Sequence, residues 1–253
     1  MNSSLRRKEL LNYLEKNHIG YTSALCQELK VSAMTIHRDF EAMAKQGLVT
    51  LIRGGAAINH GSAVLYSQGL RQTQLPLEKR RIAAYCAGLV HEGTTVYLDC
   101  GSTAERIAEA LRTKKGITVL TNSLDSAHVL SGSKENKLVM VPGIFFAPLR
   151  GFSGQMTTEF MSRFNVDILF LGANGLSVGS GLTSPDFTDA DTKRVLVKLA
   201  QKVVVATDHT KLGKDCFITI AKLSEIDLIV TDNEADTHII EDMREHGANI
   251  KLV

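Results

Sequence analysis

Apolar residues near the start of the chain recur every three or four positions, which is the spacing of one face of a helix. Ser3 and Ser4 are good N-caps for the first predicted helix, whose inward positions are Leu5, Leu10, Leu11 and Leu14. Thr22 or Ser23 can cap a second, shorter helix, whose inward positions are Leu25, Cys26 and Leu29. The pattern therefore predicts two helices at the start of the chain.

A third helix follows a tight turn at Val31 and Ser32. Ser32 is placed to cap this helix, which runs to about Gln46, and Gly47 is its C-terminal stop. Its buried face is supplied by Met34 or Ile36, together with Phe40 and Met43. Two short helices joined by such a turn form a helix-turn-helix, whose second helix puts its N-terminal side chains into the major groove of DNA.

A β-hairpin is predicted directly after the third helix. Leu48 to Ile52 forms a β run, Arg53-Gly54-Gly55 forms a tight turn, and Ala56 to Ile58 forms a return strand. This hairpin is a wing, whose arginine tip would lie against the DNA backbone or in the minor groove. The residues that we expect to contact DNA from the helix and the wing are Ser32, Ala33, Thr35, His37, Arg38, Arg53, Gly54 and Gly55.

One acidic residue of the third helix has a different expected role. Asp39 follows Arg38 and faces the first helix, so we expect it to orient an arginine within the motif rather than to touch DNA. Residues 1–57 hold 8 Lys+Arg against 5 Asp+Glu, a surplus that suits a phosphate backbone. Winged helices also occur as protein-binding modules, so an inert interaction module is the alternative.

The whole N-terminal segment resembles the DeoR family of bacterial regulators. The residues that make the resemblance are Arg6, Leu10, Leu14, Ser32, Thr35-Ile36-His37-Arg38-Asp39-Phe40 and Arg53-Gly54-Gly55-Ala56. Three positions depart from the family pattern: His37 stands where arginine is general, Phe40 where leucine is usual, and Arg53 where histidine commonly precedes the two glycines. The change at His37 bears on which operator sequence is bound, not on DNA binding itself.

A polar stretch separates this segment from the rest of the chain. Asn59 to Leu77 contains Gly61, Gly69 and Pro76 and lacks sustained periodicity, so we interpret it as a linker. The predicted organisation is a winged helix-turn-helix domain at residues 1–58, a linker at 59–77 and a larger domain at 78–253.

Short β-rich runs alternate with helical ones in the larger domain. The predicted strands are Thr95 to Leu98, Ile117 to Thr121, Lys137 to Val141, Asp167 to Leu171, Val203 to Thr207 and Asp227 to Thr231. The predicted helices are Glu78 to His91, Thr103 to Thr113, Ser123 to Leu130, Met156 to Arg163, Asp189 to Gln201 and Asp236 to Glu245. Such alternation predicts a mainly parallel, doubly wound α/β domain with helices on both faces of its sheet.

Polar clusters follow the carboxyl ends of several predicted strands, where ligands bind in sheets of this kind. The candidate effector-binding residues in these clusters, together with a lysine near the start of a later helix, are Asp99, Gly101, Ser102, Thr103, Asn122, Ser123, Asn174, Lys193, Asp208 and Lys211. Glycine, hydroxyl groups and helix N-terminal amides can bind an anion, Asp99 can hold sugar hydroxyls, and Lys193 can supply a cation. Plain helix caps and turn residues are the alternative for each cluster taken alone.

This part of the chain resembles the C-terminal sensor domain of the DeoR family from about Glu78 to Asp232. The resemblance implies binding of a phosphorylated sugar or related metabolite. Pro142-Gly143 stands where the family often has two glycines, and Asn174 where aspartate is usual, so the identity of the effector stays open.

The leading hypothesis is therefore a transcriptional regulator, usually a repressor in this family, and not an enzyme. The rival is a sugar-phosphate isomerase-like enzyme, because the sensor fold resembles that of pentose phosphate isomerases and could supply acid, base and phosphate anchor from Asp99, Lys193, Asp208 and Lys211. A DNA-architectural protein is disfavoured by the modest net charge of +2 and by the size of the ligand-type domain.

Composition narrows the remaining classes. The four cysteines form no C-x-x-C pair and the eight histidines no metal-binding spacing, so we expect no metal, no cofactor and no disulfide framework. Charged or polar residues interrupt every apolar run well short of the roughly 20 residues that a membrane span needs. We expect a cytoplasmic protein whose partners are operator DNA and a phosphorylated effector, and a homo-oligomer, dimer or tetramer, that binds paired half-sites.

Overall fold

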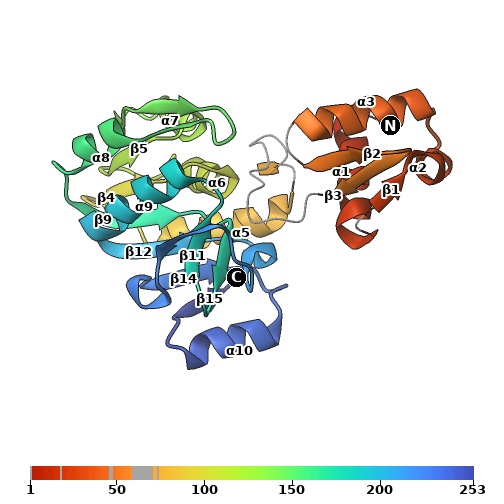
Figure 1. Cartoon of the computed structure of the whole chain (residues 1–253). Helices are drawn as coiled ribbons and strands as arrows, with labels where there is room; N and C mark the ends of the chain where they lie inside the picture. Colours follow the sequence, from red (N-terminus) through yellow and green to blue (C-terminus); the bar gives the residue numbers. More distant parts are fainter. Residues whose placement is uncertain (1, 18, 46–47, 59–70, 73) are drawn as a thin grey trace. The chain divides into compact units, whose positions relative to one another are not determined.

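The computed structural model describes residues 2–17, 19–45, 48–58, 71–72 and 74–253 (Figure 1). Contacts divide the chain into two compact units, Met1–Leu70 and Arg71–Val253. The predicted helix stop at Gly47 and most of the predicted linker lie outside the described residues. None of the helices in the described ranges is long and apolar enough to cross a membrane.

The first unit is a winged helix-turn-helix, as predicted. Its elements in chain order are α1 (Ser3–Asn17), β1 (Ile19–Tyr21), α2 (Thr22–Leu29), α3 (Ala33–Lys45), β2 (Val49–Ile52) and β3 (Gly55–Ile58). The strands form an antiparallel sheet in the order β1-β3-β2, of which β2 and β3 are the wing. Side chains from all three helices and from the wing share one core, which includes Leu10, Leu14, Leu25, Ile36, Phe40, Met43 and Val49.

Several details of the first unit differ from the sequence predictions. The Ser4 amide donates to Asn2 Oδ1 at 3.1 Å, so Asn2, one residue before the predicted Ser3, satisfies the first turn of α1. Tyr21 is the N-cap of α2 and makes no side-chain cap bond. Strand β1 was not predicted, because three residues are too few to show a period of two.

The second unit contains a seven-stranded sheet in the order β15-β14-β12-β9-β4-β5-β6. All its strand pairs are parallel, and the chain winds outward in both directions from β4 and β9, which confirms the predicted doubly wound fold. The strands of this sheet are β4 (Thr95–Leu98), β5 (Thr118–Thr121), β6 (Lys137–Met140), β9 (Val166–Leu171), β12 (Ala200–Ala206), β14 (Leu228–Thr231) and β15 (Ile250–Leu252).

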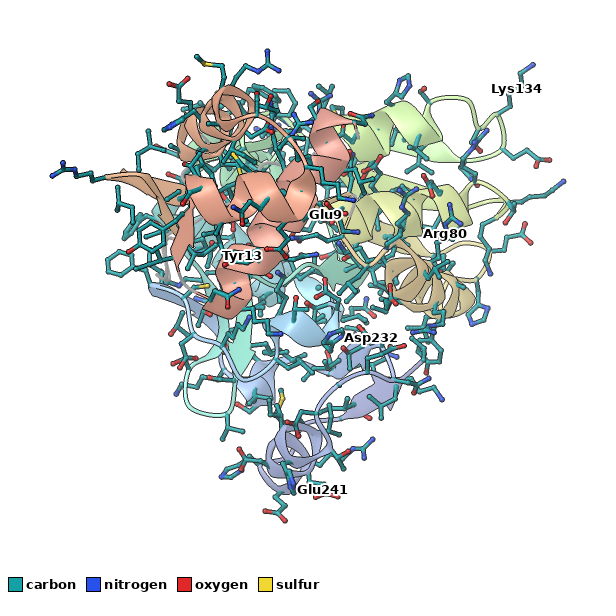
Figure 2. All side chains as sticks on the ribbon, turned by 90° about the vertical axis from the view of Figure 1, so that its right-hand side faces the viewer. Glu9, Tyr13, Arg80, Lys134, Asp232 and Glu241 are labelled. Atoms are coloured by element: carbon teal, nitrogen blue, oxygen red, sulfur yellow. The ribbon has the colours of Figure 1, made fainter. Side chains whose placement is uncertain are left out.

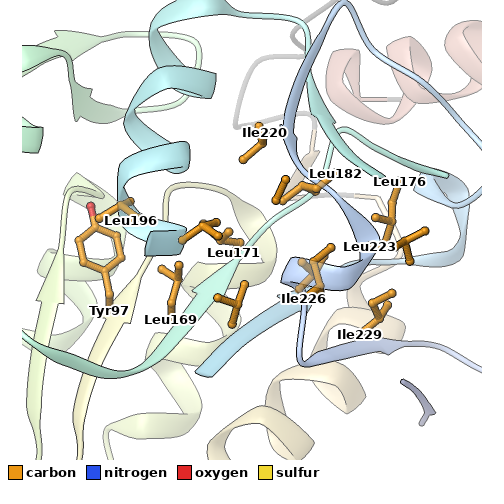
Figure 3. Close-up of a cluster of buried hydrophobic side chains, with 14 of the residues drawn as sticks. Tyr97, Leu169, Leu171, Leu176, Leu182, Leu196, Ile220, Leu223, Ile226 and Ile229 are labelled. Atoms are coloured by element: carbon orange, nitrogen blue, oxygen red, sulfur yellow. The ribbon is translucent and has the colours of Figure 1, made fainter. Parts of the chain in front are cut away.

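Helices cover both faces of the sheet, and alternate residues of each strand point to opposite faces. On one face, Val96 and Leu98 of β4 share a core with α5 (Pro76–Gly88), α6 (Ser102–Leu111) and α7 (Leu124–Leu130). On the other face, Tyr97 shares a core with α8 (Gln155–Met161), α9 (Phe187–Leu199) and α10 (Thr237–Glu245). Figure 3 shows Tyr97, Leu169 and Leu171 of this second core beside Leu196 of α9.

Charged side chains lie on the surface of the second unit. Lys134, in the loop before β6, and Glu241, on the outer side of α10, point away from the ribbon (Figure 2). Helix α10 buries Ile240 and Met243 on its inner side, so it has the apolar inner face and polar outer face expected of a helix that covers a sheet.

Short additional strands were not predicted. Strands β7 (Ile144–Phe146) and β8 (Gly151–Ser153) form an antiparallel hairpin. Strands β10 (Gly175–Ser177), β11 (Gly181–Ser184) and β13 (Ile218–Ala221) form a three-stranded antiparallel sheet.

The second unit begins earlier than predicted. Gln72 donates to Glu105 at 2.6 Å, and Arg71 donates to the Pro148 carbonyl at 3.1 Å. These residues come from the C-terminal part of the predicted linker, yet they bond to residues far along the chain. The folded second unit therefore includes a segment before Glu78 that composition alone marked as polar and irregular.

Candidate functional site

A pocket lies beyond the carboxyl ends of β4, β9 and β12, where the parallel sheet changes its direction of winding. Each of these strands ends in a run that lines the pocket, because carboxyl ends of parallel strands meet at one edge. The structure brings seven of the ten predicted effector residues to it: Gly101, Ser102, Thr103, Asn174, Lys193, Asp208 and Lys211.

Three predicted residues do not line the pocket, and two of these have structural roles. Ser123 Oγ accepts the Ser126 amide at 3.1 Å and so caps α7. Asn122 Nδ2 donates to the Phe152 carbonyl at 2.7 Å and so ties β5 to β8. A turn residue was the alternative for Asn122, and the cap made by Ser123 was not foreseen.

Asp99, the third of these residues, lies under the pocket in a buried ionic cluster. Lys193 Nζ is 3.1 Å from Asp99 Oδ2 and 3.0 Å from Asp189 Oδ2, and all three side chains are buried. Burial opposes the charged form of Lys193, but Asp189 and Asp99 outweigh it and raise its pKa. Burial also raises the pKa of Asp99, against the opposing effect of Lys193.

This cluster changes the role predicted for Lys193. Its ammonium is paired with two carboxylates, so its charge is already compensated before an anionic ligand binds. Asp99 Oδ2 also accepts the Gly172 amide at 3.2 Å, whereas Oδ1 is buried and has no hydrogen-bond partner among the described residues. A buried carboxylate oxygen without a partner is uncommon in folded proteins.

The cations missed by the sequence analysis are Arg71 and Lys79, which also line the pocket. The Arg71 side chain is half-buried; burial lowers its pKa, yet an arginine stays protonated at neutral pH. Its Nε atom has no hydrogen-bond partner within the described part of the chain. Arg71 lies in the polar stretch taken for a linker, and no signal in a single sequence marks it as a site residue.

Lys79, on the first turn of α5, holds the segment that contains Arg71. Its Nζ donates to the carbonyl oxygens of Arg71 at 2.6 Å and Gln74 at 2.8 Å, and lies 3.9 Å from Asp208 Oδ2. Burial lowers the pKa of Lys79 to about 8, with Asp208 opposing the shift. The ammonium therefore titrates close to neutral pH while facing a pocket.

The Gly101-Ser102-Thr103 turn brings the N-terminus of α6 to the same pocket. Gly101 has φ +129°, a conformation that side-chain-bearing residues rarely adopt, which explains the glycine. The free amides of the first helical turn and the helix dipole both favour an anion there.

Asp208 is a carboxylate that lines the pocket near the cation Lys79. Its Oδ1 accepts the Thr210 amide at 3.2 Å and the Thr210 hydroxyl. Burial raises its pKa, but Lys211, Thr210 and Lys79 together outweigh burial and lower it. The carboxylate therefore stays ionised at neutral pH and attracts the Lys79 ammonium.

The predicted DNA-contacting residues gather at the start of α3 and at the tip of the wing. Ala33, His37, Arg38 and Arg53 are exposed. Ser32 Oγ accepts the Thr35 amide at 3.2 Å and bonds the Thr35 hydroxyl at 2.9 Å, so Ser32 caps α3 as predicted.

The two wing glycines serve different purposes. Gly54 has φ +80° and forms the turn, where a side chain would be strained. Gly55 is buried, and a Cβ there would lie 2.1 Å from the Gly20 carbonyl oxygen, so the close approach of β1 requires glycine. The contacts that these residues make with DNA stay predictions.

Asp39 joins α3 to α1. Its fully buried carboxylate accepts Arg6 Nε at 2.5 Å and Arg7 Nε at 2.9 Å. The expectation that Asp39 pairs with an arginine within the motif is confirmed, and the arginines come from the first helix. That Asp39 does not touch DNA stays a prediction. This ion cluster fixes the recognition helix against its support.

Comparisons with known proteins agree with both units. The model of the DeoR-like helix-turn-helix domain matches residues 6–62, and that of the DeoR C terminal sensor domain matches residues 75–233. The glycerol-3-phosphate regulon repressor of Escherichia coli is 27% identical over 252 residues, covering 100% of both chains.

Two other relatives are more similar in sequence. The HTH-type transcriptional regulator GlpR of Haloferax volcanii is 31% identical over 245 residues, which covers 97% of this chain and 96% of its own. The HTH-type transcriptional repressor GlcR of Bacillus subtilis is 31% identical over 223 residues, which covers 88% of this chain and 86% of its own.

Proposed function

This chain belongs to the DeoR family of transcriptional regulators, and from this premise we propose that it represses a carbohydrate-metabolism operon under control of a phosphorylated sugar. The winged helix binds the operator, and the pocket of the second unit binds the effector. The Escherichia coli relative is named for glycerol-3-phosphate, a small phosphorylated polyol, which supports this class of ligand.

The observation that supports a phosphate most strongly is the set of cationic groups that line the pocket. Arg71, Lys79 and the N-terminus of α6 all line it, and Arg71 offers a buried Nε–H that lacks a partner among the described residues. Guanidinium groups and helix N-terminal amides are established donors to phosphate oxygens. A phosphate bound here would satisfy that buried donor and reduce the repulsion between the cations.

The pocket also holds groups that suit hydroxyls. Asn174 lines it with an amide that both donates and accepts, and Ser102 and Thr103 line it as well. Hydroxyls are the groups that such acceptors bind without introducing a second charge. A ligand that carries both a phosphate and hydroxyl groups therefore matches the residues that line the pocket.

We propose that the pocket senses its ligand without turnover. An isomerase would need a proton acceptor that reaches the ligand. Asp208 is bonded to Thr210, and Lys193 is bonded to two carboxylates. Asp99 has an unpaired oxygen but does not line the pocket. The DNA-binding unit on the same chain also provides an output for ligand binding, which a sensor needs and an isomerase does not. Release of an isomerised sugar phosphate in a coupled assay would contradict this part of the proposal.

A thermal-shift screen tests the ligand class. The full chain is heated with phosphorylated sugars and with the same sugars lacking phosphate. A ligand at 100 times its dissociation constant stabilises the second unit by about 2.7 kcal/mol. We expect Arg71→Gln to lose this response, and Arg81→Gln to keep it, because Arg81 is an exposed residue of α5 that pairs with Glu234. Equal stabilisation by unphosphorylated sugars, or an unchanged response in Arg71→Gln, would exclude phosphate from this pocket.

A further inference from the structure

Met34 is an exposed apolar residue at the start of the recognition helix. It is the second residue of α3, and the residue is 77% exposed, the largest fraction among the large hydrophobic residues that the structure describes. The sequence left Met34 and Ile36 as alternatives for the buried face; Ile36 is 0% exposed and takes that place with Phe40 and Met43. Packing of the first unit therefore does not require Met34.

The position of Met34 on α3 places it where base edges are contacted. Recognition helices enter the major groove with their N-terminal residues. His37 and Arg38 follow Met34 by three and four residues, so all three share one exposed helix face. Thr35 lies to the side of this face, and its hydroxyl bonds Ser32 Oγ at 2.9 Å, which engages it in the helix cap.

The chemistry of the side chain identifies the base. Hydrogen-bond donors and acceptors line the major groove, and its apolar group is the C5 methyl of thymine. A thioether chain offers no hydrogen bond of note and adapts its shape to an apolar partner. Single exposed apolar residues are ordinary on protein surfaces, so the location at this helix terminus is what gives Met34 a function.

We propose that Met34 is a specificity-determining residue that contacts the C5 methyl group of a thymine in each operator half-site. This inference rests on the proposed binding of operator DNA by the first unit. It adds an apolar contact to the polar contacts predicted for His37 and Arg38. It also gives the operator a preference that the pattern of charges on α3 would not produce.

The test uses the full chain without effector. Selection from randomised duplex DNA first identifies the preferred operator. Each thymine in it is then replaced singly by uracil, which removes only the C5 methyl. For the wild type, we expect one thymine per half-site at which uracil weakens binding about fourfold, the effect of one buried methyl group. For Met34→Ala, uracil at that thymine should have no effect.

Two further variants make the test specific. Met34→Leu keeps an apolar contact and should keep the uracil effect, whereas Met34→Gln, of similar length, should lose it and shift selection towards adenine. Because Met34 is exposed, these variants should unfold at the temperature of the wild type.

The outcomes separate this inference from the proposed function. If the wild type selects an operator but no uracil substitution weakens binding, or if Met34→Ala keeps the same uracil effect, Met34 does not contact a thymine methyl. If the wild type selects no sequence at all, the proposed function is wrong and the inference falls with it.

Discussion

Lys79 and Lys193 are both buried lysines at the same pocket, yet their surroundings move their pKa values in opposite directions. Lys193 lies between two carboxylates, which outweigh burial and raise its pKa. Lys79 bonds two neutral carbonyls and lies 3.9 Å from its nearest carboxylate, so burial prevails and lowers its pKa to about 8. The first ammonium is part of the scaffold, and the second can respond to an anion.

A pH dependence of effector binding follows from Lys79. A phosphate favours the protonated ammonium, and a phosphate ester is already mostly dianionic above its second pKa of about 6. Affinity should therefore be highest between about pH 7 and pH 8 and fall as Lys79 loses its proton above pH 8. Calorimetric titrations from pH 7 to pH 9.5 measure this. Lys79→Arg should bind independently of pH over that range; a wild type that is equally flat would remove Lys79 from the anion site.

Substitution of Ser102 tests whether the N-terminus of α6 binds the phosphate. A carboxylate at the N-terminus of α6 would occupy the amides and repel a phosphate. Ser102→Glu should therefore abolish the thermal response to the effector and leave operator binding intact, whereas Ser102→Ala should lose no more than about tenfold in affinity, the equivalent of one hydrogen bond. An unchanged response in Ser102→Glu would place the phosphate elsewhere.

At the scale of elements, regular periodicity decided what the sequence could predict. Six strands of the seven-stranded sheet and six helices of the second unit were predicted, because β-rich runs alternate there with helical periodicity. Strands β11 and β13 have four residues, as several of the predicted strands do, so length alone does not explain why they were missed. Strands of three residues, such as β7 and β15, are shorter than two alternations, and their pairing is a tertiary effect. The bulk of the pocket could be predicted because parallel strands end at one edge.

The remainder of the pocket had no such signal. Arg71 reaches it from a segment before the first long helix, and that segment is held by Lys79 through backbone carbonyls. Carbonyl bonds leave no pattern in side-chain identities. Asn122 and Ser123 were included among the effector residues although they do not line the pocket, because a strand end that caps a helix or ties two strands has the same residue types as one that binds a ligand.

The link between α1 and α3 gives a prediction about the first unit. Asp39 is fully buried and accepts bonds from Arg6 and Arg7. Removing one partner of a buried ion pair destabilises a fold by about 3–5 kcal/mol. Asp39→Ala should therefore increase hydrogen exchange of amides in α1 and α3, measured by mass spectrometry, and leave α5 and α6 unchanged.

Arg38 is the matched control on the same helix. It is exposed, so Arg38→Ala should leave exchange in α3 unchanged while weakening operator binding by about 1–3 kcal/mol. If Asp39→Ala exchanged like the wild type and lost only DNA affinity, Asp39 would be a DNA-contacting residue after all.

At the scale of the whole molecule, one chain supplies one recognition helix. A single helix-turn-helix contacts too few base pairs for specificity, and such proteins bind paired half-sites about one helical turn apart or a multiple of it. We therefore expect a homo-oligomer, a dimer or a tetramer. Light scattering at micromolar concentration, with and without an operator of two half-sites, measures it. A monomer under both conditions would contradict this expectation.

The position of Arg71 makes the coupling between ligand and operator testable. Arg71 lines the pocket and is also the first residue of the second unit. In the chain it comes directly after the unit that binds DNA. In the free protein, the Lys79 ammonium donates to the carbonyl oxygens of Arg71 and Gln74. An effector phosphate that binds this ammonium would compete with those two carbonyl oxygens. The start of the second unit would then differ between the free and bound states.

Linkage requires this coupling to be reciprocal. If the effector changes the operator dissociation constant by a factor typical of allosteric proteins, about 5 to 150, operator DNA must change the effector dissociation constant by the same factor. Two titrations measure it: effector into protein with and without operator, and operator into protein with and without effector. Lys79→Met removes the ammonium that bonds the Arg71 carbonyl and should bring both factors towards one together, since a single conformational equilibrium sets them. A variant that lost effector affinity but kept the full factor would show that Lys79 binds the ligand without transmitting its presence, and the coupling would then have to run through another part of the pocket.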